Sequence, residues 1–353
     1  MSGLLPSPDF TWDPTKNPPR AGLRPWRQDT YRLEAEPQDG RLIVHNYGHA
    51  GAGITMSWGC AQEIVNIITG NGHAAGEAVA VLGGGVMGLT AAVLLKEKGF
   101  AVTVYAANFP PNTTSNVAGG QWAPASVQHN NKAQFERILT NAFNMHKQRG
   151  AAYGVSLRPN YATEELPSFA DVPTSLVPPP DKLAHLPFAK LSGPGVCYHT
   201  LLVEPPIFLP RLLADLDTLP RVERRPKTFA SMNQVLSDPD ITQRIVVNCT
   251  GLGAKQICND PKVHPVKGQL VMLPAQPQLQ YLFCAPGYLF PRRDAVVVGG
   301  SEEFDVTDDT PNLAMCWKIL NHVKSAFEPS LMAAITPNFV RAALTPSWLI
   351  RNK

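Results

Sequence analysis

A chain of 353 residues exceeds the usual size of one domain, so we expect two or three domains and an ample buried core. Hydrophobic residues make up 44% of it and charged residues 17%, proportions that exclude an intrinsically disordered protein. The formal net charge is only +3, and no basic stripe is interleaved with aromatic residues, so we expect no nucleic-acid partner.

The N-terminal residues and the cysteines predict the compartment. Residues 1–20 contain neither a basic segment nor a long apolar one, so they do not have the pattern of a secretory signal. The six cysteines lie far apart, and none belongs to a CxxC pair or to a cluster with histidine, as a zinc site would need. We therefore expect reduced, mostly buried thiols, no metal site and a cytoplasmic protein.

Two glycine-rich segments occur in the first hundred residues. RLIVHNYGHAGAGITMSWGCAQEIVNII, from Arg41, predicts a strand, a loop whose backbone a ligand can approach, and an amphipathic helix. AVAVLGGGVMGLTAAVLL, from Ala78 to Leu95, is long and uncharged enough for a transmembrane helix. Each of its consecutive glycines would cost about 1 kcal/mol inside a helix. We therefore predict a strand, a glycine turn and a helix, and no membrane span.

The second of these segments has the pattern of a dinucleotide-binding sheet. Gly83, Gly85 and Gly88 form a GxGxxG motif between strand and helix, which suits a pyrophosphate at the helix N-terminus. The strand FAVTVYA follows, and RIVVNCTGLGA, from Arg244, predicts another buried strand. These elements predict a Rossmann-like α/β sheet. The acidic residue that usually binds the ribose is missing, and Asn108 is the nearest polar group.

Proline is unusually common, at 34 residues. It clusters at residues 6–25, 159–194 and 205–226, where we expect loops and short strands rather than long helices. Leucine, phenylalanine and valine recur through residues 166–187, which predicts a surface loop or edge strands of a second domain rather than a disordered linker.

Segments spread over most of the chain resemble the signature segments of D-amino-acid oxidases, which are FAD-dependent enzymes with a glutathione-reductase-like fold. They are AGLRPWRQDTYRLE, HNYGHAGAGIT, VLGGGVMGLTAA, VYAANF, TTSNVAGGQW, HTLLVEP, VVNCTG, GYLFPRRDAVVVGG and EPSL. HNYGHAGAGIT together with AGLRP is the most specific match. The resemblance implies a Rossmann-like FAD-binding domain and a second, substrate-binding domain with a mainly antiparallel sheet. The first would hold residues 41–125 and 225–265, the second residues 20–40, 126–224 and 266–346, and residues 1–19 would be an N-terminal extension.

The order of these segments departs from the family and predicts a circularly permuted chain. Segments that resemble the family's carboxyl end lie here at residues 21–55, ahead of the nucleotide-binding strand. Joining the old termini at TGNGHAAGEA, residues 69–78, requires them to be close, as chain termini often are. RAALTPSW, residues 341–348, resembles a degraded copy of RAGLRPWR, with Thr345 in place of Arg24.

The resemblance implies an enzyme that oxidatively deaminates a D-amino acid to an imino acid, which hydrolyses to a keto acid. A hydride passes to flavin N5, and oxygen reoxidises the flavin to give hydrogen peroxide. Arg24 would pair bidentately with the substrate carboxylate, Tyr288 would donate a second hydrogen bond to it, and the Gly51 carbonyl would accept one from the amine. His49 is a candidate general base by residue type, but in a loop of this family it can have a structural role instead. We therefore expect no side chain to act as acid or base.

The same resemblance implies the residues that contact FAD. Reduction places negative charge at flavin N1 and C2, which a helix N-terminus stabilises. The implied contacts are Gly83, Gly84, Gly85, Val86 and Met87 at the pyrophosphate, Asn108 near the ribose, Thr113, Thr114, Gly120 and Gln121 along the phosphates and the ring, Thr250 beside the cofactor, and Gly51, Gly53, Ile54 and Thr55 at N1 and C2.

Two departures from the family concern the substrate. Cys284 stands where vertebrate-like members carry a second tyrosine, four residues before Tyr288. If Glu302 faces the pocket, its charge favours a cationic substrate side chain, whereas a solvated surface position would leave it without effect.

Other functions stay open at this point. A glycine or sarcosine oxidase, a flavin dehydrogenase with another electron acceptor, and a non-catalytic flavin-binding protein all share the FAD motifs. A nicotinamide dehydrogenase shares GxGxxG but has no use for HNYGHAGAGIT. The sequence leaves the oligomeric state open, including a homo-oligomer in which the N-terminal segment is swapped.

Overall fold

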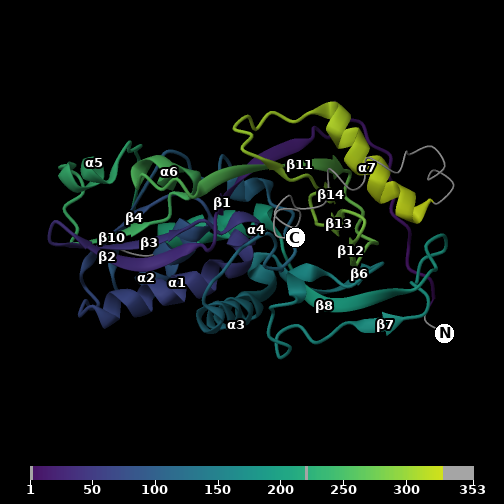
Figure 1. Cartoon of the computed structure of the whole chain (residues 1–353), viewed down its shortest axis with the longest axis horizontal. Coiled ribbons are helices and arrows are strands. Elements are labelled where there is room, and N and C mark those ends of the chain that lie inside the picture. The colour runs from purple at the N-terminus through teal and green to yellow at the C-terminus, as the bar shows by residue number, and fades with distance from the viewer. Residues whose placement is uncertain (1–2, 219–221, 329–353) are drawn as a thin grey trace.

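The computed structural model describes residues 3–218 and 222–328. Its strands form two sheets, one of six strands and one of nine, which lie side by side along the long axis of the molecule (Figure 1). The α-helices of the described residues are α1 (Gly53–Gly70), α2 (Val86–Glu97), α3 (Lys132–Arg149), α4 (Pro205–Thr218), α5 (Met232–Ser237), α6 (Ala254–Ile257) and α7 (Leu313–Phe327).

The six-stranded sheet contains the predicted dinucleotide-binding elements. All neighbouring strands are parallel except the β2–β3 hairpin. The strands predicted near Arg41, Ala78, Ala101 and Arg244 are therefore confirmed and adjacent. In spatial order the sheet is β2 (Arg32–Gln38), β3 (Arg41–Tyr47), β10 (Ile245–Asn248), β4 (Ala78–Leu82), β5 (Ala101–Ala106) and β9 (Val222–Pro226).

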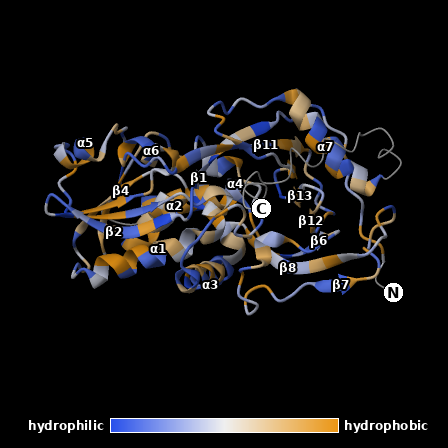
Figure 2. Cartoon of the chain, in the orientation of Figure 1, coloured by the Kyte–Doolittle hydropathy of each residue, from blue (hydrophilic) through white to orange (hydrophobic). Residues whose placement is uncertain are grey.

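Helices α1 and α2 cover one face of this sheet, and α3 packs on α1. Apolar side chains of these helices and of the strands form one buried cluster, and Figure 2 shows hydrophobic strands flanked by helices of mixed hydropathy. At Gly59 an added Cβ would lie 2.7 Å from the backbone carbon of Ile138, so α1 and α3 meet closely there. Residues 78–95 form β4, the glycine turn and most of α2, as predicted. Within the described ranges, no helix is long and apolar enough to cross a membrane.

The nine-stranded sheet is mainly antiparallel, as expected for the second sheet; only β12 and β6 pair in parallel. Helix α7 packs on β11 and β14 and closes an apolar cluster there (Figure 1). The spatial order is β1 (Arg20–Arg27), β11 (Val263–Leu273), β14 (Val296–Gly299), β13 (Tyr288–Pro291), β12 (Leu282–Cys284), β6 (Val155–Ala162), β8 (Gly195–Val203) and β7 (Asp181–Leu183), with β15 (Glu303–Phe304) also on β11.

Proline marks irregular structure in one predicted region but not in another. The edge strand β7 lies in the stretch 166–187, which confirms the expected edge strand. The expectation of no long helix at 205–226 is wrong, because α4 runs from Pro205 to Thr218. Prolines in the first helical turn lose no backbone hydrogen bond. The buried Phe208 and Leu212 then hold the helix against the core despite Pro210.

The sheets cross the predicted domain boundaries at two strands. Strand β2, assigned to the substrate domain, pairs with β3 because residues 39–40 form a tight hairpin turn. Strand β9, most of which was assigned to that domain too, pairs with β5. The division into domains stays a prediction, with these two strands in the six-stranded sheet.

The remaining expectations concern cysteines, metals and termini. All six cysteines carry free thiols, and five are buried, as expected. In the part of the chain that the structure describes, no cluster of histidine, cysteine and carboxylate side chains could hold a metal ion. The N-terminal extension packs through Phe10 and Trp12 on the cluster under α7. The proposed degraded copy at residues 341–348 lies outside the described residues.

Candidate active site

A cavity of about 740 Å³ lies at the carboxyl ends of the parallel strands, where the two sheets meet. Ligands in sheets of this kind gather at that edge. Every residue predicted for the site lines this one cavity, although the predictions came from segments far apart in the chain. These residues are Arg24, Gly51, Gly53, Ile54, Thr55, Gly83, Gly84, Gly85, Val86, Met87, Asn108, Thr113, Thr114, Gly120, Gln121, Thr250 and Tyr288.

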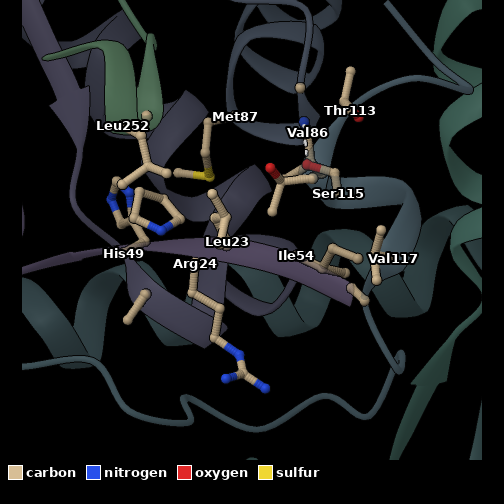
Figure 3. Close-up of a pocket in the computed structure, with 18 of the residues that line it drawn as sticks. Leu23, Arg24, His49, Ile54, Val86, Met87, Thr113, Ser115, Val117 and Leu252 are labelled. Carbon is tan, nitrogen blue, oxygen red and sulfur yellow. Dashed lines mark hydrogen bonds between the residues drawn. The ribbon is translucent and has the colours of Figure 1, made fainter. Parts of the chain in front are cut away.

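The glycine turn between β4 and α2 leaves room for a ligand against the backbone. Gly83 has φ +117°, a conformation that favours glycine. A Cβ at Gly88 would lie 2.9 Å from the Gly83 carbonyl carbon, so the helix packs directly on the turn. The N–H of Val86, at the start of α2, donates a 3.0 Å hydrogen bond to Ser115 Oγ (Figure 3). The sequence did not predict Ser115 as a site residue, because a serine in a short 3₁₀ turn belongs to no recognisable motif.

A second helix begins beside this turn. Helix α1 starts at Gly53, and no side chain caps its N-terminus. An added Cβ at Gly53 would lie 3.6 Å from Val86 Cγ1, so the two helix N-termini are neighbours in the cavity. Each contributes positive dipole potential and N-terminal amides that have no partner within their own helix. Two such termini at one cavity favour a ligand with more than one electron-rich group.

The residues around this part of the cavity fit FAD. The close packing of Gly83 and Gly88 makes a cradle that side chains would fill. Asn46 also lines the cavity, and its buried Oδ1 has no hydrogen-bond partner among the described residues. A buried amide oxygen normally has a donor, so this one suits a bound group. The turn at Gly83, the start of α2 and the start of α1 would hold FAD here.

The end of the cavity that Asn108 lines is called the adenosine end here, because the resemblance implies the FAD ribose at this residue. Lys227, Thr228 and Phe229, which the sequence did not predict, join Asn108 in the lining from the segment after β9. The Lys227 ammonium is paired with Asp238 at 2.5 Å and with Asp240 at 2.7 Å. No sequence signal marks this segment, because it reaches the cavity only through the pairing of β9 with β5.

Arg24 is the principal cation at the other end of the cavity. It lies on β1, and Figure 3 shows its guanidinium extended away from the strand. Arg24 Nη1 donates a 2.9 Å hydrogen bond to the Ser301 carbonyl. A Cβ at Gly268, on the neighbouring strand, would lie 2.6 Å from Arg24 Cζ, so the guanidinium lies directly over this glycine. The group is thereby fixed while keeping donors for a ligand carboxylate.

Tyr288 is held beside Arg24 by stacking of its ring on Phe290 and by the close approach of the backbone at Gly300. Its ring stacks on Phe290, with centroids 4.5 Å apart. An added Cβ at Gly300 would lie 2.8 Å from Tyr288 Oη, so no side chain fits between the two. Burial raises the pKa of Tyr288, although the positive charge of Arg24 opposes this. The phenol is therefore a neutral hydrogen-bond donor in the physiological range.

His49 lines the same cavity but is held as a structural group. Its side chain is 1% exposed, and burial lowers the pKa of His49 to about 3. The imidazole stacks on Tyr31 at 5.2 Å, and Nε2 lies 3.5 Å from Cys60 Sγ. A neutral imidazole with this pKa is a poor proton acceptor, so these contacts favour the structural role over the general base.

Comparisons with known proteins agree with this geometry. The family described as DAO, FAD dependent oxidoreductase, matches residues 78–169 and 219–351. The chain is 29% identical to D-aspartate oxidase of Homo sapiens over 72% of this chain and 77% of that protein. It is 30% identical to D-amino-acid oxidase of Streptomyces coelicolor over 72% of this chain and 79% of that protein.

A solved structure, the L-amino acid deaminase from Proteus vulgaris, superposes with a TM-score of 0.46 at 13% identity, over 63% of this chain and 60% of that one. The family match covers more than half of the chain, and it agrees with the glycine cradle and the two helix N-termini at the cavity. The chain is a member of the DAO family of FAD-dependent oxidoreductases.

Proposed function

We propose that this enzyme oxidises D-amino acids to imino acids, with oxygen as electron acceptor. The observation that carries the proposal is the position of Arg24 and Tyr288 in the same cavity as the two helix N-termini. A guanidinium and a neutral phenol side by side suit a carboxylate, and the cradle suits a dinucleotide. The D configuration is supported by relatives named as D-amino-acid and D-aspartate oxidases.

The chain's own residues bind and orient the substrate in this proposal. Arg24 pairs with the substrate carboxylate, Tyr288 donates to the same group, and the Gly51 carbonyl accepts from the amine. When bound, FAD supplies the acceptor for the hydride of the substrate Cα–H and passes the two electrons on to oxygen. The residues contribute positioning and electrostatics rather than proton transfer. His49, neutral and packed on Tyr31, takes no part in it.

The proposal is tested by the absorption spectrum of the purified protein under anaerobic conditions. A flavin spectrum that bleaches with D-alanine and not with L-alanine supports it, and peroxide should form on admission of oxygen. Bleaching by glycine or N-methylglycine alone would favour an amine oxidase, and bleaching without peroxide a dehydrogenase. A flavin that no amino acid reduces would point to a non-catalytic flavin-binding protein.

We further propose that the segments run in a circularly permuted order. The family match begins at residue 78, and residues 1–77 lie outside it. Nevertheless β1 and β3 are integral strands of the two sheets, and Arg24 and Gly51 line the cavity. The proposed joint, residues 69–78, runs from the last turn of α1 to the first residue of β4. Residues 71–77 between them form a short turn, mostly exposed, in which Gly72 has no atom within 4 Å of an added Cβ. A chain rearranged to begin at residue 77, with residues 1–76 appended through a flexible linker, should fold and bind FAD.

A further inference from the structure

Glu302 is an acidic side chain in the cavity that the proposed chemistry does not use. It follows Ser301, whose carbonyl holds Arg24, and it lines the cavity beside Tyr288. Ser126 Oγ, from the loop that leads into α3, donates a hydrogen bond to Glu302 Oε1. Its negative charge contributes to the raised pKa of the Tyr288 phenol. Glu302 is therefore close to the groups proposed to hold the substrate carboxylate, and it is oriented by Ser126.

The charges that line the cavity are few. In the part of the chain that the structure describes, they are Arg24, Lys227 and Glu302, since His49 is neutral. Lys227 is already paired with two aspartates at the adenosine end, whereas no ion pair involves Glu302 among the described residues. Once Arg24 holds the substrate carboxylate, the only unpaired charge that the described residues place at that end is negative. A second carboxylate on the substrate would meet no free cation among these residues and would be repelled.

We infer that Glu302 selects substrates whose side chain ends in a cation, so that the enzyme prefers basic D-amino acids to neutral ones and rejects acidic ones. This inference rests on the proposed function and names its substrate class. Arg24 and Glu302 are opposite charges in one cavity and do not pair with each other. Together they match a molecule with a carboxylate at one end and an ammonium or guanidinium at the other. Ser126 keeps the Glu302 carboxylate in place without neutralising it.

The test compares kcat/KM for D-lysine, D-norleucine and D-aspartate in the wild type, in Glu302→Gln and in Asp309→Asn. D-Norleucine has nearly the length of D-lysine without its charge. Asp309 is exposed seven residues further along the chain, beyond β15, and lies outside the cavity, so Asp309→Asn removes one negative charge as a matched control. A charged hydrogen bond of ordinary strength predicts that Glu302→Gln lowers kcat/KM for D-lysine by about 10- to 100-fold. D-Norleucine should change less than about threefold in the same variant, and Asp309→Asn should change neither.

A second measurement does not depend on turnover. Binding of 6-aminohexanoate and hexanoate to the FAD-loaded protein is followed by perturbation of the flavin spectrum. Both ligands lack the α-amine, so any difference between them reports the distal cation. The wild type should bind 6-aminohexanoate more tightly, and Glu302→Gln should remove that preference.

Several outcomes would overturn the inference. Equal losses for D-lysine and D-norleucine in Glu302→Gln would mean that Glu302 holds the α-ammonium. A wild type that oxidises D-aspartate as well as D-lysine would mean that its charge does not act on the substrate. If the enzyme oxidises D-norleucine but shows no preference for D-lysine, the inference is wrong and the proposed function still holds. If no D-amino acid reduces the flavin, the proposed function is wrong, and equal binding of the two hexanoates would then also contradict the inference.

Discussion

The two ends of the cavity are built by different means. The end proposed for the FAD phosphates is built from backbone: the turn at Gly83, the start of α2 and the start of α1, where side chains are excluded by close packing. The end proposed for the substrate carboxylate is built from side chains of the second sheet and its loops, chiefly Arg24, Tyr288 and Glu302. A backbone site is lost when a side chain is added, whereas a side-chain site is altered when one is exchanged. Cofactor binding and substrate choice should therefore respond to separate substitutions.

The largest effect is expected at the backbone end. Gly83→Val places a branched side chain at φ +117°, 2.9 Å from the backbone carbon of Cys249, so the variant should retain no FAD after purification. The flavin absorbance per protein chain measures this. Gly72→Val is the control, because Gly72 also has positive φ but no atom within 4 Å of an added Cβ. It should lose about 1 to 2 kcal/mol of stability and keep its FAD, and equal flavin loss in both variants would count against the cradle.

Arg24→Ala should have the next largest effect, confined to the substrate. Loss of a bidentate charged pair predicts a fall in kcat/KM of about a thousandfold, or about 4 kcal/mol. FAD content should stay unchanged, because Arg24 lies at the other end of the cavity. Arg20→Ala, exposed on the same strand, serves as the control. Steady-state kinetics with a D-amino acid decide the matter, and unchanged kinetics in Arg24→Ala would refute the role of Arg24.

Between these sites, a buried ion pair joins the two sheets. Arg27 Nε on β1 donates to Asp260 Oδ2 at 2.8 Å, and the Tyr47 hydroxyl at the end of β3 donates to the same oxygen at 2.9 Å. Asp260→Asn should lower the free energy of unfolding by about 3 kcal/mol at neutral pH. Urea denaturation measures this, and Asp217→Asn, in the exposed pair with Arg224, should show little change.

The same pair predicts a pH dependence. Burial acts to raise the pKa of Asp260, but hydrogen bonds from Arg27 and Tyr47 leave it below its usual value. The folded-state pKa is thus lower than that of the unfolded chain, about 3.9. The stabilisation is complete above about pH 4 and is lost as the pH falls through the folded-state pKa. The wild type should lose more stability than Asp260→Asn between neutral and strongly acidic pH, and parallel acid profiles would contradict this.

Tyr288→Phe should have the smallest of these effects. Removing one neutral donor to the carboxylate predicts a roughly tenfold fall in kcat/KM, or about 1.4 kcal/mol. Because burial raises the pKa of Tyr288 above its ordinary value, the phenol keeps its proton throughout the neutral and mildly alkaline range. The ratio of wild-type to variant kcat/KM should therefore be constant from pH 7 to pH 9. A ratio that fell toward one in this range would show that Tyr288 ionises.

Local patterns in the sequence predict the backbone end well. Strand periodicity and GxGxxG locate β4, α2 and β5, because each depends on neighbouring residues only. The loop HNYGHAGAGIT likewise predicts the start of α1. The helix at 205–218 is missed, because proline counts as a breaker unless the burial of Phe208 and Leu212 is known.

Contacts between distant segments are where sequence patterns fail. Lys227 reaches the cavity through the pairing of β9 with β5, and Ser115 through a 3₁₀ turn beside α2. The orientation of Glu302 depends on Ser126, which is 176 residues away. The place of β2 in the six-stranded sheet depends on the position of β3, which pairs with β2 on one side and with β10 on the other. Such pairings are decided by tertiary packing, which a single sequence does not display.

The central claim is that residues from the first 55 positions and from the segment after Ala78 hold one FAD and one substrate carboxylate in a single cavity. A crystal structure of the FAD-loaded protein with a substrate-like carboxylate tests it most directly. The account predicts the pyrophosphate against Gly83–Met87, the flavin ring beside Gly51–Thr55, and the carboxylate on Arg24 and Tyr288. A flavin ring away from Gly51–Thr55, or a carboxylate that does not contact Arg24, would contradict it.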